Sequence, residues 1–242
     1  MNIKKDNQHI FWEHAGKSGY GNAMFSSSSV ERHIRFTIWD AALKMAGVIG
    51  LNAKSRILEL GCGDGNFTGT VLAKNFLDVD GYDYSTAAIK RAESMYGSES
   101  IHFYAADVRE LTYSQDQCWD GAFLMGFLHH VKESTPAIVT RLSKVVPRVI
   151  VADPNGDNLI RKALECLPAY RHRGEDSFRL NQLKYIFKSA GYKLVSQNIV
   201  SFVPPFTPWF LLDLMSRLER IADSNSLFKK INSTYVLGFE LK

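Results

Sequence analysis

The sequence predicts a single doubly wound α/β domain with a mostly parallel sheet. Short apolar segments that suit buried strands alternate with amphipathic segments that suit helices, which is the pattern of a parallel sheet covered by helices on both faces. Acidic residues follow several of these segments, at the edge of the sheet where ligands bind in open α/β folds. The predicted strands cover residues 57–60, 79–82, 101–105, 119–125, 148–153, 192–202 and 234–240.

Length and composition indicate an ordinary globular protein. The 242 residues are enough for one domain with a large core and too few for two complete ones. The net charge is +4 and the basic residues are scattered, so charge does not favour nucleic-acid binding. Cys62, Cys118 and Cys166 lie far apart without Cys-x-x-Cys spacing, which indicates neither disulfides nor a zinc site. With no apolar run of about 18 residues and a polar beginning, we expect a cytoplasmic protein without a transmembrane segment.

The turn after the first predicted strand indicates a small-molecule site. Its glycines, Gly61, Gly63 and Gly65, let the backbone adopt positive φ and approach a ligand closely. A dinucleotide fingerprint requires Gly-x-Gly-x-x-Gly, and Asn66 stands where its third glycine should be. Glu59 and an acid in the turn would also repel a pyrophosphate. The turn therefore suits a ligand that carries positive charge and no phosphate.

Residues 59–65, Glu-Leu-Gly-Cys-Gly-Asp-Gly, resemble the first motif of the class I S-adenosylmethionine-dependent methyltransferases. The likeness extends to about Asp153. It implies a Rossmann-like, seven-stranded sheet whose seventh strand is antiparallel, and S-adenosylmethionine as the cofactor. In that family the turn backbone, here Gly61, Cys62 and Gly63, holds the methionine part, while the acid matching Glu59 orients the turn.

The ends of the second and third predicted strands suit the nucleoside part of this cofactor. Asp83 is placed to accept hydrogen bonds from a ribose diol, and Tyr84 offers a face for adenine. By the same resemblance, Asp107 beside Val108 would meet the adenine amino group. Both acids could instead act as helix caps, for example before the helix that begins at Ser85.

The end of the fourth strand decides the predicted acceptor class. Methyltransferases that act on exocyclic base amines show Asn or Asp, two prolines and an aromatic residue at this point. Here Met125 is followed by Gly-Phe-Leu-His-His-Val, which resembles the Leu-His-His ending of small-molecule O-, N- and C-methyltransferases. A sugar, lipid, polyketide or quinone-like acceptor is therefore expected.

Two adjacent histidines, His129 and His130, are the candidate catalytic residues. Neighbouring side chains point in different directions on a regular backbone, so no metal is predicted. One histidine could be a buried structural residue, or either could be the general base for a substrate hydroxyl, with His130 preferred. Asp153 and Asn155, in a polar turn after the fifth strand, are substrate-side candidates, although turn chemistry with a helix cap at Asn158 would also explain them.

Residues 1–50 are predicted to form an aromatic arm and an amphipathic helix with a capping box of Ser28 and Glu31. The apolar residues recur at helical spacing to Gly50. Similar arms in small-molecule methyltransferases fold over the cofactor, so Tyr20 is the preferred lid residue, with simple packing as the alternative.

Residues 203–232 form an insertion between the cofactor-binding core, 51–202, and the last strand, 233–242. Pro208 is expected at the first position of its helix. Phe206, Trp209 and Phe210 exceed what a short helix needs, which leaves open an apolar substrate cover, a dimer face or a peripheral membrane contact. The oligomeric state is not predicted.

Three other functions remain open on the sequence. A nucleotide-linked oxidoreductase would share the glycine turn and the ribose acid, although Asn66 and the acids of the turn weigh against it. An RNA or protein methyltransferase would keep the cofactor and show a basic face around the strand ends. A non-catalytic cofactor-binding protein would show binding without turnover.

Overall fold

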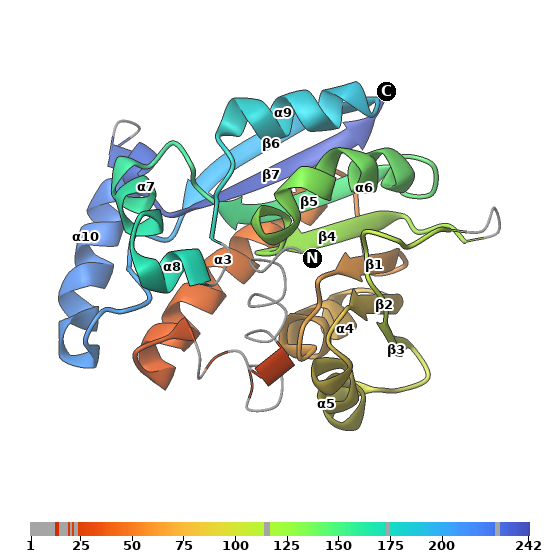
Figure 1. Cartoon of the computed structure of the whole chain (residues 1–242), viewed down its shortest axis with the longest axis horizontal. Coiled ribbons are helices and arrows are strands. Elements are labelled where there is room, and N and C mark those ends of the chain that lie inside the picture. Colours follow the sequence, from red (N-terminus) through yellow and green to blue (C-terminus); the bar gives the residue numbers. More distant parts are fainter. Residues whose placement is uncertain are drawn as a thin grey trace.

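Seven strands form one sheet in the order β3-β2-β1-β4-β5-β7-β6 in the computed structural model (Figure 1), which describes residues 13–14, 19, 21, 24–113, 117–172, 175–225 and 228–242. The strands are β1 (Arg56–Leu60), β2 (Asp78–Asp83), β3 (Ile101–Ala105), β4 (Gly121–Met125), β5 (Arg148–Pro154), β6 (Tyr192–Val200) and β7 (Thr234–Leu241). Strand β7 runs antiparallel to both β5 and β6, and the other pairings are parallel. The predicted doubly wound sheet with an antiparallel seventh strand is confirmed.

The two faces of the sheet carry separate apolar cores because strand side chains alternate. Leu58 and Leu60 of β1 join one core with α6 (Thr135–Leu142) and α9 (Leu180–Ser189). Ile57 joins the other core with α3 (Ser28–Val48). The remaining helical elements are η1 (Thr68–Leu72), α4 (Ala73–Asn75), α5 (Thr86–Tyr96), η2 (Leu128–Ser134), α7 (Leu159–Glu165), α8 (Pro168–His172), η3 (Trp209–Leu211), α10 (Leu212–Ser224) and η4 (Phe228–Ile231).

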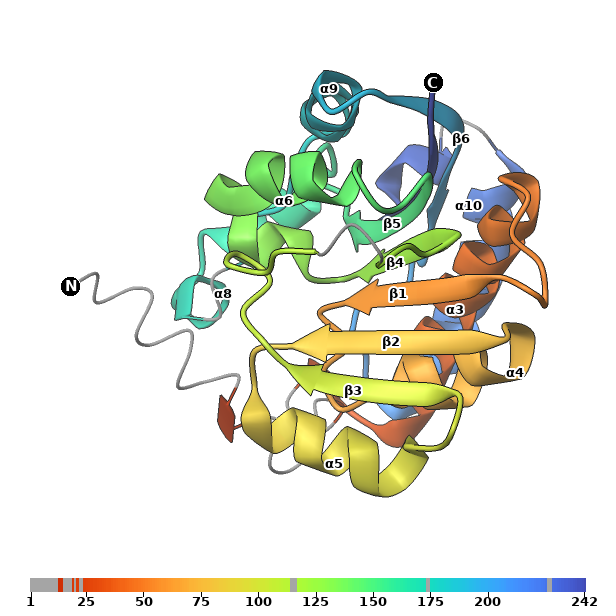
Figure 2. The same ribbon diagram turned by 90° about the vertical axis from the view of Figure 1, so that its right-hand side faces the viewer.

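The parallel strands deliver their carboxyl ends to one edge of the sheet. Figure 2 shows β1 to β5 pointing the same way, with α8 beyond their ends. Strands β1 and β4 are neighbours at the point where the strand order reverses. In doubly wound sheets this is where a crevice for a ligand forms.

Three local predictions were wrong by one or two residues. Helix α3 is capped by Ser27, whose extended backbone lets its Oγ accept from the Val30 amide at 3.4 Å, and not by Ser28. Strand β4 begins at Gly121 instead of residue 119, because Trp119 turns its ring nitrogen to Asp80 Oδ2 at 2.7 Å.

The third correction concerns the insertion. Pro208 precedes the helical residues and is not the first of them, since its ψ of 138° is extended. A short 3-10 turn, η3, leads into α10.

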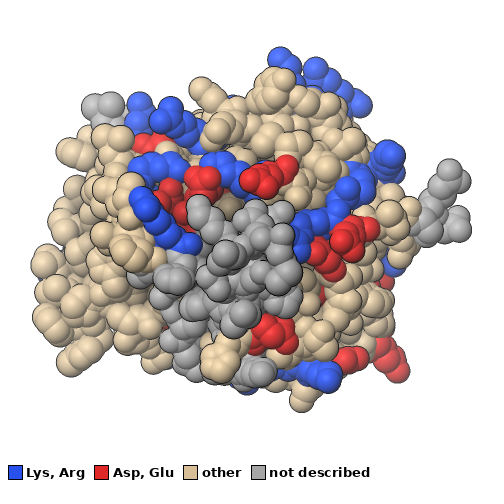
Figure 3. Space-filling view, in the orientation of Figure 1, with Lys and Arg blue, Asp and Glu red and all other residues tan. Residues whose placement is uncertain are grey.

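The surface is mixed in character. Figure 3 shows acidic and basic side chains interspersed across the face viewed, whereas the left margin, where Figure 1 places α10, is almost free of charge. No helix in the described ranges is long and apolar enough to cross a membrane.

The turn at Gly65 provides a test of the fold. Gly65 has φ +73°, and a Cβ there would lie 2.7 Å from Ala92 Cβ and 2.9 Å from Phe103 Cζ. We expect Gly65→Ala to lower the free energy of unfolding by roughly 2–4 kcal/mol through strain and overpacking. Gly47→Ala is the control, because a Cβ on Gly47 meets no described atom within 4 Å. It should raise stability by about 0.5 kcal/mol. Urea denaturation measures both, and equal midpoints would contradict the expectation.

Candidate active site

The glycine turn is fixed to the neighbouring strand through its backbone. The amides of Gly61 and Cys62 donate to the Tyr82 carbonyl at 2.7 and 3.1 Å. Gly61 and Gly63 have φ of +75° and +56°, and a Cβ on Gly61 would lie 2.6 Å from Phe127 Cβ. Only glycine fits at position 61, because a Cβ would collide with Phe127. Gly61 and Gly63 line the cavity at the ends of the strands.

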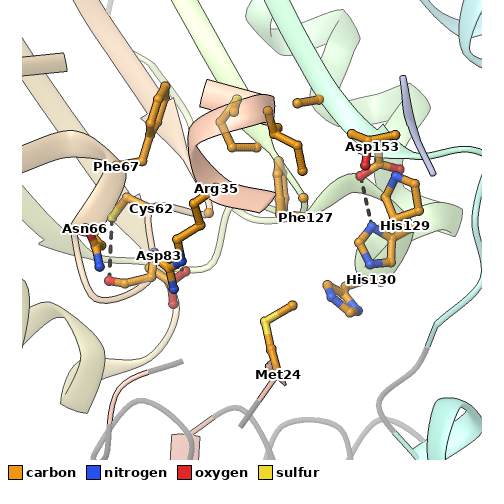
Figure 4. A pocket seen from close by; sticks show the side chains of 18 of the residues that line it. Met24, Arg35, Cys62, Asn66, Phe67, Asp83, Phe127, His129, His130 and Asp153 are labelled. Carbon is orange, nitrogen blue, oxygen red and sulfur yellow. Dashed lines mark hydrogen bonds and ion pairs between the residues drawn. The ribbon is translucent and has the colours of Figure 1, made fainter. Parts of the chain in front are cut away.

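A cavity of about 560 Å³ lies at the carboxyl ends of the strands. It is within the usual size of a small-molecule site. The predicted site residues that line it are Glu59, Gly61, Cys62, Gly63, Asp83, Tyr84, Asp107, Val108, Met125, His129, His130 and Asp153. Figure 4 shows that the cavity has two sides, with Cys62, Asn66 and Asp83 facing His129, His130 and Asp153 across it.

Buried carboxyl groups dominate the first side. Asp83 accepts from the amides of Gly63 at 3.0 Å and Ser85 at 2.9 Å. Burial nevertheless raises its pKa to about 6. Burial also raises the pKa of Glu59 to about 8, although Thr68 donates to it at 2.5 Å. A ligand with positive charge would stabilise both ionised carboxylates.

The two predicted adenine contacts, Tyr84 and Asp107, line the cavity together with Asp83. Asp107 accepts from the amide of Arg109 at 2.9 Å and from its Nε at 2.8 Å, so it closes a turn as well as lining the cavity. Burial raises the pKa of the neighbouring Tyr84 phenol, which therefore stays neutral. Burial likewise raises the pKa of the Cys62 thiol, which favours packing over thiolate chemistry there.

The second side is built around His129, which two carboxylates hold from opposite ends of the ring. Its Nδ1 lies 2.9 Å from Asp153 Oδ1 and its Nε2 lies 3.4 Å from Glu175 Oε2. Burial alone would lower its pKa, but the two carboxylates prevail and raise it to about 9. His129 is therefore an imidazolium at neutral pH. The second oxygen of Asp153, Oδ2, is buried with no hydrogen-bond partner among the described residues.

The segment after α8 completes this side. Glu175 is also ion-paired with Arg161 of α7, and Arg161 in turn contacts Glu165 at 3.1 Å. Although burial would raise the pKa of Glu175, His129 and Arg161 hold it well below its usual range. Neither Glu175 nor Arg161 was predicted as a site residue in this role. The sequence gives no signal for Glu175, since its contact with His129 depends on how residues 154–176 return to the sheet.

His130 lies beside His129, with ring centroids 3.9 Å apart. Figure 4 shows it on the same side of the cavity, toward Met24. Atoms of His129, His130 and Glu175 lie within 4.8 Å of one another, close enough for metal ligands. The charges of Asp153 and Glu175 are already balanced by His129 and Arg161, and the predicted absence of a metal stays a prediction.

Two predicted residues are not placed in the cavity. Asn155 is not among the described residues that line it, because its side-chain amide donates to the carbonyls of Lys230 at 3.1 Å and Asn232 at 2.8 Å. The turn interpretation is thus the better one for Asn155. Asn158 caps α7 by accepting from the Ile160 and Arg161 amides. Tyr20 lies outside the described residues.

The cavity also has an apolar wall, which was not predicted as part of the site. Ile34 and Ile38 of α3 line the cavity together with Val203 and Pro205 from the segment after β6. Arg35 also reaches the cavity, where it pairs with Glu31 at 2.9 Å. The helical spacing of the isoleucines was visible in the sequence, but not that their face continues beyond the core into a cavity.

Residues 31–197 match a family described as methyltransferase domain. The chain belongs to this family of methyltransferases. Solved structures that share its fold include an S-adenosylmethionine-dependent methyltransferase and a methyltransferase with bound SAM. The sequence resemblance is thereby confirmed.

Known proteins agree with this membership. An O-methyltransferase of Penicillium expansum is 25% identical over 146 residues, which cover 57% of this chain and 52% of that protein. This chain therefore spans about half the length of that curated relative.

Two solved structures share the fold. The first is a complex of the Haloferax volcanii Trm112 methyltransferase activator and a methyltransferase, with TM-score 0.70, 14% identity and coverage of 95% of this chain and 97% of that one. The second is the magnesium protoporphyrin IX methyltransferase of Synechocystis PCC 6803 with bound SAH, with TM-score 0.63, 14% identity and coverage of 97% and 99%.

The pairing of His129 with Glu175 is testable by titration. Nuclear magnetic resonance of the His129 ring should give a pKa near 9 in the wild type. In Glu175→Gln the pKa should fall, because a carboxylate that stabilises the cation is lost. Glu110→Gln, an exposed acid outside the cavity, is the control and should leave it unchanged.

The same pairing has a consequence for stability. Because the folded pKa of His129 is raised, its stabilising effect is complete below about pH 6.5 and is lost as the pH rises through about 9. The stability difference between wild type and Glu175→Gln should therefore shrink over that range in urea denaturation. A wild-type pKa near 6.5 would contradict the proposed ion pair.

Proposed function

We propose that this methyltransferase transfers the methyl group to an oxygen atom of a small molecule with a largely apolar body. Nitrogen or carbon acceptors are the alternatives within the same class. One observation carries the proposal: the cavity joins an acidic side, suited to a cationic cofactor, to a side with histidines and an apolar wall. The name of the Penicillium expansum relative, an O-methyltransferase, also supports oxygen as the acceptor atom.

The acidic side would hold the cofactor, which supplies an activated methyl group on a sulfonium. The backbone of residues 61–63 would hold its methionine part, and Glu59 would keep the turn in place through Thr68. Asp83 would accept hydrogen bonds from the ribose hydroxyls, since both its oxygens are already oriented by backbone amides. Tyr84 and Asp107 would contact the adenine.

His130 would take the proton from the acceptor hydroxyl. His129 would position His130 and Asp153, while Asp153 Oδ2 would accept a hydrogen bond from the acceptor. Ile34, Ile38 and Val203 would contact the apolar body and exclude water.

A nucleic-acid acceptor is less well supported. The face shown in Figure 3 carries acidic side chains among the basic ones instead of a continuous basic surface. Incubation with methyl-labelled S-adenosylmethionine and a panel of phenols, sugars, lipids and quinols tests the proposal directly. Methylation of transfer RNA or of protein, with none of the small molecules labelled, would contradict it.

Binding of the cofactor should depend on Asp83. We expect Asp83→Asn to raise the Kd for S-adenosylmethionine by roughly 10- to 100-fold, because the amide keeps the shape but loses the charged acceptor. Asp40→Asn is the control, since Asp40 of α3 does not line the cavity. Isothermal titration calorimetry measures both, and an unchanged Kd in Asp83→Asn would exclude the ribose role.

Catalysis should depend on His130, the proposed proton acceptor. His130→Gln should lower kcat for a hydroxyl acceptor by roughly 100- to 1,000-fold, because the proton acceptor is lost. The Kd for S-adenosylmethionine should not change. His102→Gln is the control, because the half-buried His102 of β3 does not line the cavity. Full activity of His130→Gln would show that the acceptor needs no base from His130.

A further inference from the structure

The insertion between β6 and β7 exposes an unusual number of large apolar side chains. Trp209 is 70% exposed, Phe210 65% and Phe206 55%. They are followed along the chain by further exposed apolar residues, which are Leu211, Leu214, Leu218, Ile221, Phe228 and Ile231. Together the nine residues form what we call the apolar patch. Single exposed apolar residues need no explanation, but a set within 26 consecutive residues does.

Helix α10 presents one part of this patch in a fixed direction. Leu214, Leu218 and Ile221 recur at helical spacing and are exposed, so they share one face. The adjacent face packs on α3, where Leu212 and Met215 contact a small core. The patch therefore points away from the body of the protein.

A hydrogen bond between the two helices fixes this orientation. Glu219 of α10 is buried and lies 2.6 Å from His33 of α3. The same carboxylate accepts from the Phe202 amide at 2.6 Å. Rotation of α10 to bury the patch would break both contacts.

The patch is continuous along the chain with the cavity wall. Val203 and Pro205 line the cavity, and Phe206 follows directly. The Pro205 carbonyl accepts from the Ser26 amide at 2.9 Å, which joins this segment to the start of α3. A surface that covers the patch therefore lies next to the apolar wall of the active site.

Charge distinguishes between possible occupants of the patch. Arg217, Arg220 and Lys230 are exposed in the same segment, and Asp213 and Asp223 are the exposed acids. With the half-buried Lys229 the segment has an excess of basic side chains. In Figure 3 the left margin, over α10, shows almost no charge. Tryptophan, phenylalanine and leucine beside arginine and lysine are typical of a helix that lies in a membrane interface.

We propose that the apolar patch docks this enzyme on the surface of an anionic lipid bilayer. Trp209 and Phe210 enter the boundary between headgroups and acyl chains, α10 lies along the surface, and the arginines contact lipid phosphates. In a twofold dimer through the same patch, the basic residues of the two copies would face one another and repel. This inference goes beyond methyl transfer and does not depend on the acceptor.

Co-sedimentation with vesicles tests the docking. The 242-residue chain should bind vesicles of phosphatidylcholine with roughly 30% phosphatidylglycerol, and bind phosphatidylcholine alone at least about tenfold more weakly. The double variant Trp209→Ser with Phe210→Ser should lose at least about tenfold in partitioning. Tyr185→Ser is the matched control, because Tyr185 on α9 is 73% exposed and outside the patch. Circular dichroism and S-adenosylmethionine binding verify that each variant is folded.

Fluorescence gives a second readout that a general loss of structure would not reproduce. Bromine-labelled acyl chains should quench tryptophan emission in the wild type, and most of this quenching should disappear with Trp209→Phe. No vesicle binding by the wild type, or equal losses in Tyr185→Ser, would overturn the proposal. It would also be overturned by a dimer in sedimentation velocity that dissociates in the double variant, since a second copy would then cover the patch.

Discussion

The site depends on the attachment of the glycine turn to the end of β2. The amides of Gly61 and Cys62 bind the Tyr82 carbonyl, and the amide of Gly63 binds the Asp83 carboxylate. The shape of the turn and the position of Asp83 are therefore one constraint. Because Phe127 packs against Gly61 without space for a Cβ, the end of β4 is placed by the same turn. The histidines that follow Phe127 thus take their position relative to the acids from this contact.

The charges of the cavity are distributed unequally between its two sides. Glu59 and Asp83 are buried with raised pKa values, so their ionised forms lack full compensation within the protein. Around His129 the opposite holds, since its imidazolium and Arg161 balance Asp153 and Glu175. A cationic ligand would therefore gain more electrostatic stabilisation on the first side than on the second. The second side can accept a neutral molecule without a charge penalty, and this asymmetry would orient the proposed cofactor and acceptor in one cavity.

The sequence predicted the doubly wound sheet, and most of the predicted site residues line the cavity, because they lie at strand ends. Parallel strands bring Glu59, Asp83 and Asp107 to one edge whatever the loops do. Asn155 shows the limit of this argument, since a turn residue next to that edge bonds to backbone carbonyls instead. Local errors such as Ser28 for Ser27 arise because neighbouring serines offer equivalent caps.

Contacts made by the variable segments could not be predicted in the same way. Glu175 reaches His129 only after α7 and α8 have folded back over the sheet, and the sequence contains no periodicity that encodes this return. The apolar wall could not be predicted for a different reason. Ile34 and Ile38 recur at helical spacing like the residues of any core helix, so their pattern does not distinguish a core face from a cavity wall. Whether such a face meets a neighbour or a cavity is decided by the path of residues 203–205.

The polar contacts of α10 balance the energy lost by exposing its apolar side chains. Leaving Leu214, Leu218 and Ile221 half exposed forfeits roughly 1 kcal/mol each of burial energy. Breaking the hydrogen bonds of the buried Glu219 carboxylate to His33 and to the Phe202 amide would leave its oxygens unpaired, which costs about 1–3 kcal/mol or more. The two quantities are comparable, so the protein gains little by turning the helix inward. The exposed face is therefore available to an apolar surface outside the protein, at no cost to the contacts that hold α10 beside the cavity.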